Sequence, residues 1–277
     1  MKKRCAVKIK FSEEELQAAQ SIRLYLQLGS ILQAIKKLEE LKEVLHAAIP
    51  DKQRQSRGIT WVVQRLALMM GEICTQKEEI KEFSAILYEH LDKADMLQGV
   101  PIFMMAEYGR VQPAEVLDFF EEAASAESWV LREFAQAGFR KLHGPNKEVV
   151  YSWLKHMVES SNPNSRRFVS EMLRPVVQGK WLRKDPDYSL ALLRHLFHEK
   201  HPYPRTSVGN NLSDLSRYQP DLIFSIVDEL VASKDKNSYW IAKRACRNLV
   251  KQYPERVLDM LGVEEYHYKD RHYRRKE

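Results

Sequence analysis

The 277-residue chain is poor in the residues that make turns and cross-links. It contains ten glycines, eleven prolines and three cysteines. Sandwiches and barrels of strands need many turns, so this shortage disfavours an all-β fold. Cys5, Cys74 and Cys246 are far apart and odd in number, and they form neither a disulfide framework nor a CxxC metal knuckle. We therefore expect a protein of a reducing compartment.

Long apolar runs and familiar catalytic signatures are also missing. No window holds about 18 uninterrupted apolar residues, so a transmembrane helix is not expected. The basic stretch 1–10 lacks the apolar run of a secretory signal. No glycine-rich phosphate loop, GxSxG or HExxH pattern is found. The sequence thus predicts a cytoplasmic protein without a membrane segment.

Positive charge is concentrated in one half of the chain. The formal net charge is +6, with 44 Lys and Arg against 38 Asp and Glu. Residues 1–150 carry a net charge of −1 and residues 151–277 a net charge of +7. A one-sided positive field suits a polyanion such as nucleic acid, although charge also serves solubility.

The apolar pattern is helical almost throughout. Ser12 and Glu15 form a capping box before a helix that reaches about residue 28. A second run over 31–48 ends before Pro50, and further helices fit 58–75, 77–92 and 96–108. No convincing pair of strands is predicted.

A repeat begins near residue 110. Five segments share a proline followed by an amphipathic run, at intervals of 32, 41, 34 and 34 residues: Pro113, Pro145, Pro186, Pro220 and Pro254. Proline suits the first turn of a helix, where its missing N–H has no partner in any case. Second helices are expected between them, over 129–142, 165–177, 205–218 and 238–253. Two helices in 32–41 residues is the period of a HEAT-type α-solenoid. We predict an all-α, right-handed α-α superhelix.

Aligning the second helices predicts one packed face and one polar face. Phe139, Leu173 and Leu212 share a packed register. Residues four apart lie on the same side of a helix. The pairs at 129 and 133, 167 and 171, and 210 and 214 therefore form polar stripes on the expected concave wall, outside the packed core. These pairs are Trp129–Glu133, Arg167–Glu171 and Asn210–Asp214.

Three histidines at regular spacing form a candidate metal site. In His195-x-x-His198-x-x-His201 the first two can share a helix face, but Pro202 follows at once and no cysteine is near. We expect no metal here, and none elsewhere in the chain. Cys246 lies in an apolar helix and is interpreted as packing.

Three segments in order resemble the AlkC/AlkD-type DNA alkylation repair glycosylases, a superfamily built of HEAT-like repeats. They run over 166–175 (RRFVSEMLRP), 205–214 (RTSVGNNLSD) and 240–249 (WIAKRACRNL). The spacing between Trp129 and Glu133 is similar to a Trp-x-x-x-Asp spacing of the AlkD branch. The resemblance covers about residues 125–262 and is closest to the AlkC branch. It implies a DNA-binding solenoid that needs no metal or cofactor.

The chemistry of that family suits the predicted carboxylates. A purine alkylated at N3 or N7 is cationic, so its glycosidic bond is weak, and cleavage develops oxocarbenium character on the sugar. A fixed carboxylate stabilises that charge and orients a water molecule. Glu171 and Asp214 are the first catalytic candidates and Glu133 the third. Arg167 is expected to hold Glu171 or to bind phosphate, and the alternative is an ordinary i,i+4 ion pair.

Basic and aromatic side chains are the candidate DNA contacts. Each aromatic residue has core packing as its alternative role. The tail 266–275 interleaves both kinds of side chain, which suits either a grip on DNA or a solvated terminus. The complete set of predicted DNA contacts is Arg166, Arg167, Arg174, Lys180, Arg205, Asn210, Lys243, Arg244, Arg247, Trp129, Trp181 and Trp240.

These inferences give one expectation with two alternatives. The expectation is a monomeric glycosylase that excises cationic alkylated purines from duplex DNA. The alternatives are a non-catalytic binder of DNA structure and a scaffold for protein interactions. The chain is divided into a single solenoid over 1–277, with N-terminal helices of unassigned role (1–99), HEAT-like repeats (100–262) and a basic aromatic tail (263–277).

Overall fold

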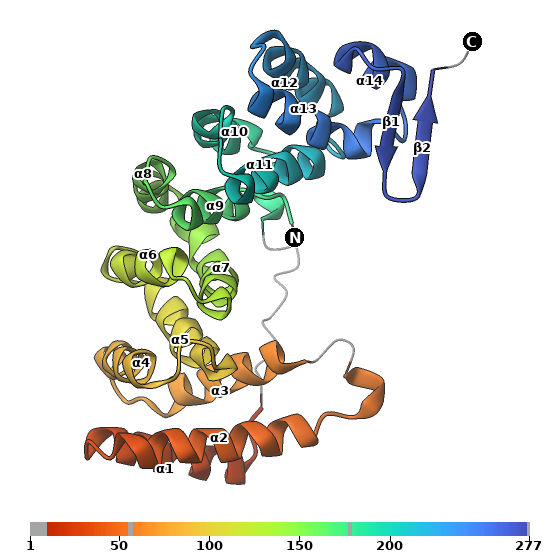
Figure 1. Ribbon diagram of the computed structural model, residues 1–277. Coiled ribbons are helices and arrows are strands. Elements are labelled where there is room, and N and C mark those ends of the chain that lie inside the picture. Colours follow the sequence, from red (N-terminus) through yellow and green to blue (C-terminus); the bar gives the residue numbers. More distant parts are fainter. Residues whose placement is uncertain (1–9, 55–57, 177–178, 276–277) are drawn as a thin grey trace, which may run out of the picture. The chain divides into compact units, whose positions relative to one another are not determined.

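The computed structural model describes residues 10–54, 58–176 and 179–275 (Figure 1). Cys5 and the basic stretch 1–9 lie outside the described residues. The described chain is helical apart from one C-terminal hairpin, so the all-α prediction is confirmed. The helices form two compact units, one of residues 1–112 and 128–138 and the other of residues 113–127 and 139–277. The expected division near residue 99 and the single solenoid stay predictions.

The first unit consists of long helices joined by short loops. Its elements are α1 (Glu13–Gln27), α2 (Ile31–Ala47), η1 (Asp51–Gln53), α3 (Ile59–Ile73), α4 (Lys77–His90), η2 (Met96–Gln98), α5 (Gly99–Gly109) and the first part of α7 (Trp129–His143).

Local sequence explains where these helices start and how they pack. The predicted capping box at α1 is present: Ser12 Oγ accepts from the Glu15 N–H at 3.1 Å, and Glu15 Oε2 accepts from the Ser12 N–H at 2.7 Å. Glu15 also pairs with Arg65, which ties α1 to α3. Helix α5 is apolar on all sides and almost wholly buried, as expected for a helix surrounded by others.

The second unit consists of shorter helices in pairs. Its elements are η3 (Pro113–Val116), α6 (Leu117–Ser125), the end of α7, η4 (Gly144–Asn146), α8 (Lys147–Val158), α9 (Pro163–Met172), η5 (Lys180–Arg183), α10 (Pro186–Leu193), η6 (Arg194–Leu196), α11 (Pro202–Leu215), α12 (Pro220–Ala232), α13 (Lys236–Leu249), α14 (Pro254–Leu261), β1 (Glu265–Tyr268) and β2 (Arg271–Arg274).

The predicted prolines start helical elements. Helix α7 matches its predicted range to within one residue, whereas α9, α11 and α13 begin and end earlier than predicted. Helices α9 and α11 also start at prolines, Pro163 and Pro202. Helix α13 starts after Asp235, whose carboxylate accepts from two N–H groups of the first turn. Helix α9 ends before Arg174 because the residue preceding Pro175 disfavours the helical conformation.

The second helices stack on one another and bury the register that the sequence predicts. Within the second unit α9 packs on α11 and α11 on α13 (Figure 1). Phe139, Leu173 and Leu212 are all fully buried. The Phe139 ring lies 4.9 Å from Trp153 and 5.3 Å from Phe168, centroid to centroid, so aromatic packing joins α7, α8 and α9.

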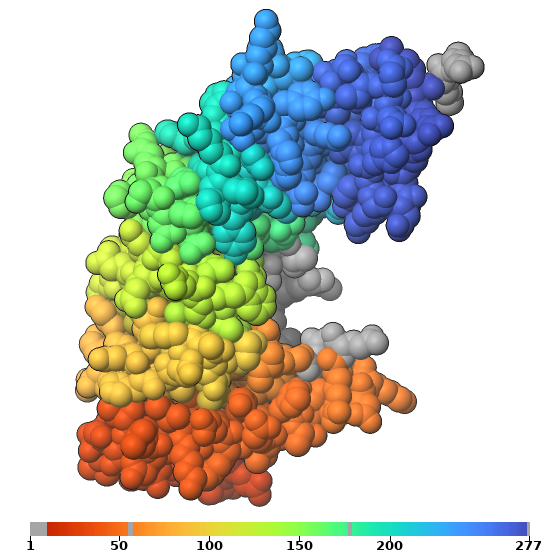
Figure 2. All heavy atoms as spheres, in the orientation of Figure 1, coloured from red at the N-terminus to blue at the C-terminus, as the bar shows by residue number. Residues whose placement is uncertain are grey.

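The C-terminal segment contradicts the prediction that no strands pair. Strands β1 and β2 form an antiparallel hairpin with Tyr266 opposite Tyr273 and His267 opposite His272. Its turn places Lys269 at φ 54°. Tyr266 is buried, and its hydroxyl donates to the Lys243 carbonyl of α13 at 2.5 Å. Figure 2 shows this segment packed against the preceding helices. The tail is therefore a folded part of the second unit.

Within residues 10–54, 58–176 and 179–275, none of the helices is both long and apolar enough to cross a bilayer.

Candidate functional site

The structure brings two of the three predicted catalytic carboxylates to one arginine. Glu171 lies near the end of α9, and Asp214 lies near the end of α11. Arg174 Nη1 donates to Glu171 Oε2 at 3.0 Å, while Arg174 Nε and Nη2 donate to Asp214 Oδ2 at 3.0 and 2.5 Å. Arg174, expected to contact DNA, thus bridges the two carboxylates.

Glu171 is a buried, ionised carboxylate. Its side chain is only 7% exposed, and Ser207 Oγ donates to Oε1 at 2.5 Å. Arg140 Nη2 lies 3.7 Å from Oε2 and donates to the Glu171 carbonyl at 3.2 Å. Burial alone would raise the pKa of Glu171, but Arg174, the Ser207 hydroxyl and Arg167 together hold that pKa below its usual value. The carboxylate is therefore charged at neutral pH.

The surroundings of Glu171 contradict one part of the sequence-based prediction. We expect Glu171 on an open polar face held by Arg167, yet Glu171 is buried and its closest cation is Arg174. Arg167 supplies a further favourable charge, and its guanidinium lies 4.4 Å from the ring centroid of Tyr203. Arg174 reaches Glu171 locally, because it follows that residue by three positions at the end of α9, and the packing of α9 on α11 brings Asp214 to the same guanidinium.

Asp214 is the more accessible acid and lies at a cation-rich cavity. Its side chain is 21% exposed, and Arg217 Nη2 lies 4.0 Å from Oδ1. The cavity has a volume of about 390 Å³ and contains five cationic side chains against two acidic ones. Such a composition favours an anionic ligand such as a phosphate group. The lining residues are Ser213, Asp214, Arg217, Arg247, Asn248, Lys251, Tyr268, Lys269, Asp270 and Arg271.

Asn210 orients two arginines of the neighbouring helix. Its Oδ1 accepts from Arg244 Nε at 2.9 Å and from Arg247 Nη2 at 2.5 Å. A Cβ at Gly209 would lie 2.8 Å from the Cβ of Arg244, so the absence of a side chain lets α13 approach α11 closely. Asn210 thus fixes the positions of the Arg244 and Arg247 guanidinium groups.

Aromatic rings and guanidinium groups alternate beside these arginines. The Trp240 ring has Arg205 at 4.7 Å and Arg244 at 5.3 Å from its centroid. Tyr268 has Arg247 at 5.2 Å. A second cavity of about 180 Å³ lies here, and alternating rings and cations are the features that single-stranded and flipped nucleotides stack on. It is lined by Trp240, Lys243, Arg244, Arg247, Tyr266, His267 and Tyr268.

Two predicted DNA contacts serve the packing of the second unit. Arg166 donates to both carboxylate oxygens of Glu199, at 2.6 and 3.0 Å, and also to the carbonyls of Ser160 and Ser161. Trp181 packs edge-on against His143. This contact fits the alternative role of core packing better than the predicted role of a DNA contact. Neither side chain is placed as a free contact for a ligand.

The remaining predicted residues lie at several places. Lys180 and Lys243 are exposed in the second unit. Trp129, 59% exposed, and Glu133, which accepts from Gln136 Nε2 at 3.3 Å, belong to the first unit.

The three histidines of the rejected zinc motif do not converge. His195 Nδ1 lies 3.7 Å from Glu159, and His198 Nδ1 lies 3.7 Å from Asp235. His201 caps α11 by accepting from the Tyr203 N–H at 3.3 Å. Each ring therefore has a separate partner.

Ser207 and Arg140 are site residues that the sequence did not single out. Alignment of the second helices only groups Ser207 with Phe134 and Phe168, yet its hydroxyl donates to Glu171. Arg140 precedes Glu171 by 31 residues, close to one repeat, and this spacing is the signal that could have found it. The two histidines of the hairpin were not predicted either. Their signal is the spacing of Glu265 and His267, because residues two apart lie on the same face of a strand.

Comparison with known proteins identifies the fold as that of helical-repeat proteins. No family model matches the chain. The structure is similar to that of the Pseudomonas fluorescens alkylpurine DNA glycosylase AlkC bound to DNA containing an abasic site analog, with TM-score 0.65 and 19% identity over 89% of this chain and 66% of AlkC. It is also similar to AlkD2 from Streptococcus mutans, with TM-score 0.58 and 19% identity over 76% of this chain and 97% of AlkD2. The predicted resemblance to AlkC/AlkD-type proteins is confirmed at the level of the fold.

A curated relative extends the comparison in sequence. The chain is 27% identical over 206 residues to the uncharacterized protein YhaZ of Bacillus subtilis (strain 168), a match that covers 69% of this chain and 57% of YhaZ. The chain thus spans just over half the length of YhaZ and 66% of the length of AlkC.

Proposed function

We propose that the second unit binds duplex DNA and excises cationic alkylated purines by hydrolysis of the glycosidic bond. The observation that carries this proposal is the pair of acids, Glu171 and Asp214, joined by Arg174 beside a cavity rich in cations. The likeness to AlkC, an alkylpurine DNA glycosylase, supports the same chemistry.

Asp214 is the acid best suited to act on the substrate. It is more exposed than Glu171 and lines the cavity. Departure of a cationic base leaves positive charge on the sugar, and a fixed carboxylate lowers the energy of that state and orients the attacking water. Asp214 is held by two hydrogen bonds from Arg174, so it needs little reorganisation during the reaction.

Glu171 acts as a positioning residue in this proposal. It is too buried to meet a nucleotide, but its carboxylate fixes Nη1 of the arginine whose other nitrogens hold Asp214. Ser207 and Arg140 in turn hold Glu171. The cationic groups of α13, Arg244 and Arg247, are proposed to contact phosphates.

The test is release of methylated purines from alkylated duplex DNA by the purified protein. We expect Asp214→Asn to lower the rate of base release about 10²- to 10³-fold, or about 2.7–4 kcal/mol, with little change in DNA affinity. The matched control is Asp228→Asn, because Asp228 is exposed on α12. An active Asp214→Asn protein would contradict the assignment of Asp214.

A non-catalytic binder of DNA structure is the second candidate. It is favoured by one feature of the site: both acids already face Arg174, so much of their negative charge is compensated. In that case the protein binds DNA but releases no base, and Asp214→Asn changes neither property.

A further inference from the structure

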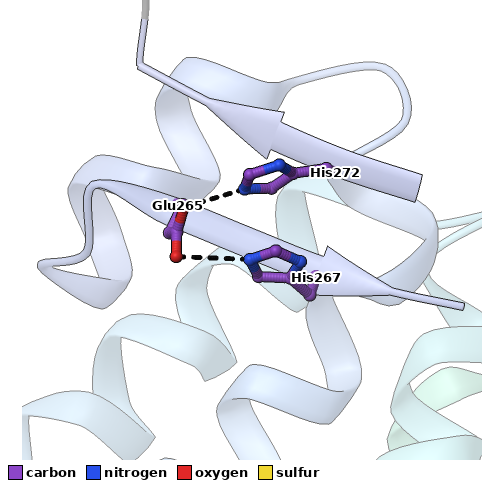
Figure 3. Close-up of side chains that lie close together, drawn as sticks. All are labelled: Glu265, His267 and His272. Atoms are coloured by element: carbon purple, nitrogen blue, oxygen red, sulfur yellow. Dashed lines mark hydrogen bonds and ion pairs between the residues drawn. The ribbon is translucent and has the colours of Figure 1, made fainter. Parts of the chain in front are cut away.

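The outer face of the C-terminal hairpin carries two histidines and a glutamate. Glu265 and His267 are two residues apart on β1 and therefore point to the same face. His272 on β2 pairs directly with His267, which places its ring on that face as well (Figure 3). Tyr266 points to the opposite face and is buried. The backbone thus presents all three groups together.

The three side chains converge closely. Glu265 Oε1 lies 3.3 Å from His267 Nε2, and Glu265 Oε2 lies 2.8 Å from His272 Nε2 (Figure 3). The imidazole rings are stacked with centroids 3.8 Å apart and planes at 20°. One ligand atom from each residue lies within 4.8 Å of the other two.

We infer that Glu265, His267 and His272 form a binding site for a divalent transition metal ion, with Zn²⁺ as the best fit. Two imidazoles and one carboxylate are a ligand set that Zn²⁺ takes, and imidazole disfavours Mg²⁺ and Ca²⁺. At Zn–N distances of about 2.0–2.1 Å, tetrahedral ligand atoms lie about 3.3 Å apart. Small rotations of exposed side chains reach this spacing. The sequence predicts no metal for this chain, and the proposal departs from that prediction.

The hairpin is suited to hold such an ion because its other face is anchored. Tyr266 donates to the Lys243 carbonyl, and Tyr268 packs against Arg247 and Lys251 of the α13 region. The strands are therefore in place before a metal arrives, which reduces the ordering cost of binding.

One cation of the hairpin competes with the metal. Arg274 Nε lies 3.5 Å from Glu265 Oε2 and 3.3 Å from His272 Nε2. The Arg274 side chain is 72% exposed, so it can turn into solvent when an ion takes its place. Exchange of an exposed ion pair for metal ligation costs little, since such pairs contribute about 0–1 kcal/mol. Arg274→Gln should therefore tighten metal binding.

The bound ion has two consequences for the second unit. It links β1 to β2 through side chains on both strands, and it leaves a coordination position for water or an oxygen ligand. His267 also lines the cavity that contains Trp240 and Arg244, so the ion adds positive charge at the edge of that cavity.

The experiment is titration of the full chain, stripped with chelator, with Zn²⁺ against a chromophoric indicator of known affinity. We expect one tight equivalent, and His267→Gln or His272→Gln should weaken it by at least about 10- to 100-fold. Co²⁺ in place of Zn²⁺ should give the visible absorption of a tetrahedral site, which each variant loses. The matched control is His46→Gln, an exposed histidine on α2, which should bind like the unaltered chain.

Folding is monitored separately, because both variants replace exposed groups and should keep the helical circular dichroism of the parent. The absence of a stoichiometric Zn²⁺ equivalent in the unaltered chain would overturn the proposal. Equal Zn²⁺ affinity in His267→Gln and the parent would overturn it as well, since the ion would then bind elsewhere. Neither outcome bears on base release.

Discussion

The two units use helices in opposite ways. In the first unit α5 is apolar on all sides and almost wholly buried, and the ion pairs Glu15–Arg65 and Arg23–Glu79 join helices at partly exposed positions. In the second unit α9, α11 and α13 bury one face, yet α9 places the Glu171 carboxylate inside the packing, where it meets Arg174 of the loop that follows. The positive excess lies in residues 151–277, which all belong to the second unit. Burial of a carboxylate costs desolvation free energy, so Glu171 depends on the cations and the hydroxyl group around it.

The sharpest test of this comparison removes the bridging arginine. We expect Arg174→Met to lower the free energy of unfolding by about 3–5 kcal/mol, because it leaves the buried Glu171 carboxylate without its nearest charge. Urea unfolding followed by circular dichroism measures the loss. Arg217→Met, which removes an exposed arginine 4.0 Å from Asp214, should cost no more than about 1 kcal/mol. Equal stability of the two variants would show that the bridge is not structural.

Buried polarity in the second unit should also make stability depend on pH. Burial, with a contribution from Arg140, lowers the pKa of His143 to about 4. The folded state therefore binds fewer protons than the unfolded state, where the pKa is about 6.5. Stability is fully present above pH 6.5 and decreases as pH falls toward 4, by up to about 3 kcal/mol.

Thermal unfolding at several pH values measures this effect. His143→Gln should flatten the profile between pH 6.5 and 4.5, where the carboxylates with lowered pKa, such as Glu171, are still ionised. His46→Gln should leave the slope unchanged, because His46 is exposed. A slope that persists in His143→Gln would assign the effect to other groups.

The proposed phosphate contacts of α13 lie in the second unit, which predicts a difference in DNA binding between the units. If Arg244 contacts one phosphate, Arg244→Gln should reduce the slope of log K against log salt by about 0.9. This corresponds to roughly tenfold weaker binding near 50 mM salt. Lys36→Gln on α2 of the first unit should change neither quantity. Fluorescence anisotropy with a labelled duplex measures the DNA affinity of both variants. A similar loss of affinity in both would contradict the predicted difference between the units.

The smallest effect belongs to the first unit. Ser12→Ala removes the side-chain oxygen that accepts from the Glu15 N–H, and should cost about 1 kcal/mol of stability. Base release per folded molecule should remain unchanged, as expected for a purely structural feature. A large loss of activity with normal stability would give α1 a role in function.

The sequence predicts the helices of this fold well because proline at a first turn is a local signal. It locates Pro186, Pro220 and Pro254 as helix starts without any knowledge of packing. The hairpin was missed because its strands are four residues each, and its turn has Lys269 at positive φ in place of the usual Asn-Gly.

The site could be predicted only in part. Residues four apart on one helix identify Glu171 and Asp214, but the partner of each depends on how far one helix is shifted along the next. That shift determines that Arg174 reaches Asp214, 40 residues later, and that Ser207 reaches Glu171. Local periodicity contains no information on such offsets, because they are set by packing between helices.

The contact of Tyr266 with α13 has a consequence for local opening of the chain. A two-stranded hairpin is only marginally stable in isolation, so its folded population depends on this attachment. When the Tyr266 ring leaves its buried site, the strand amides lose their protection from hydrogen exchange together. The hairpin then opens as one cooperative unit, with a free energy smaller than that of global unfolding. Amide hydrogen exchange at β1 and β2 therefore measures how often the Lys243 carbonyl releases its donor.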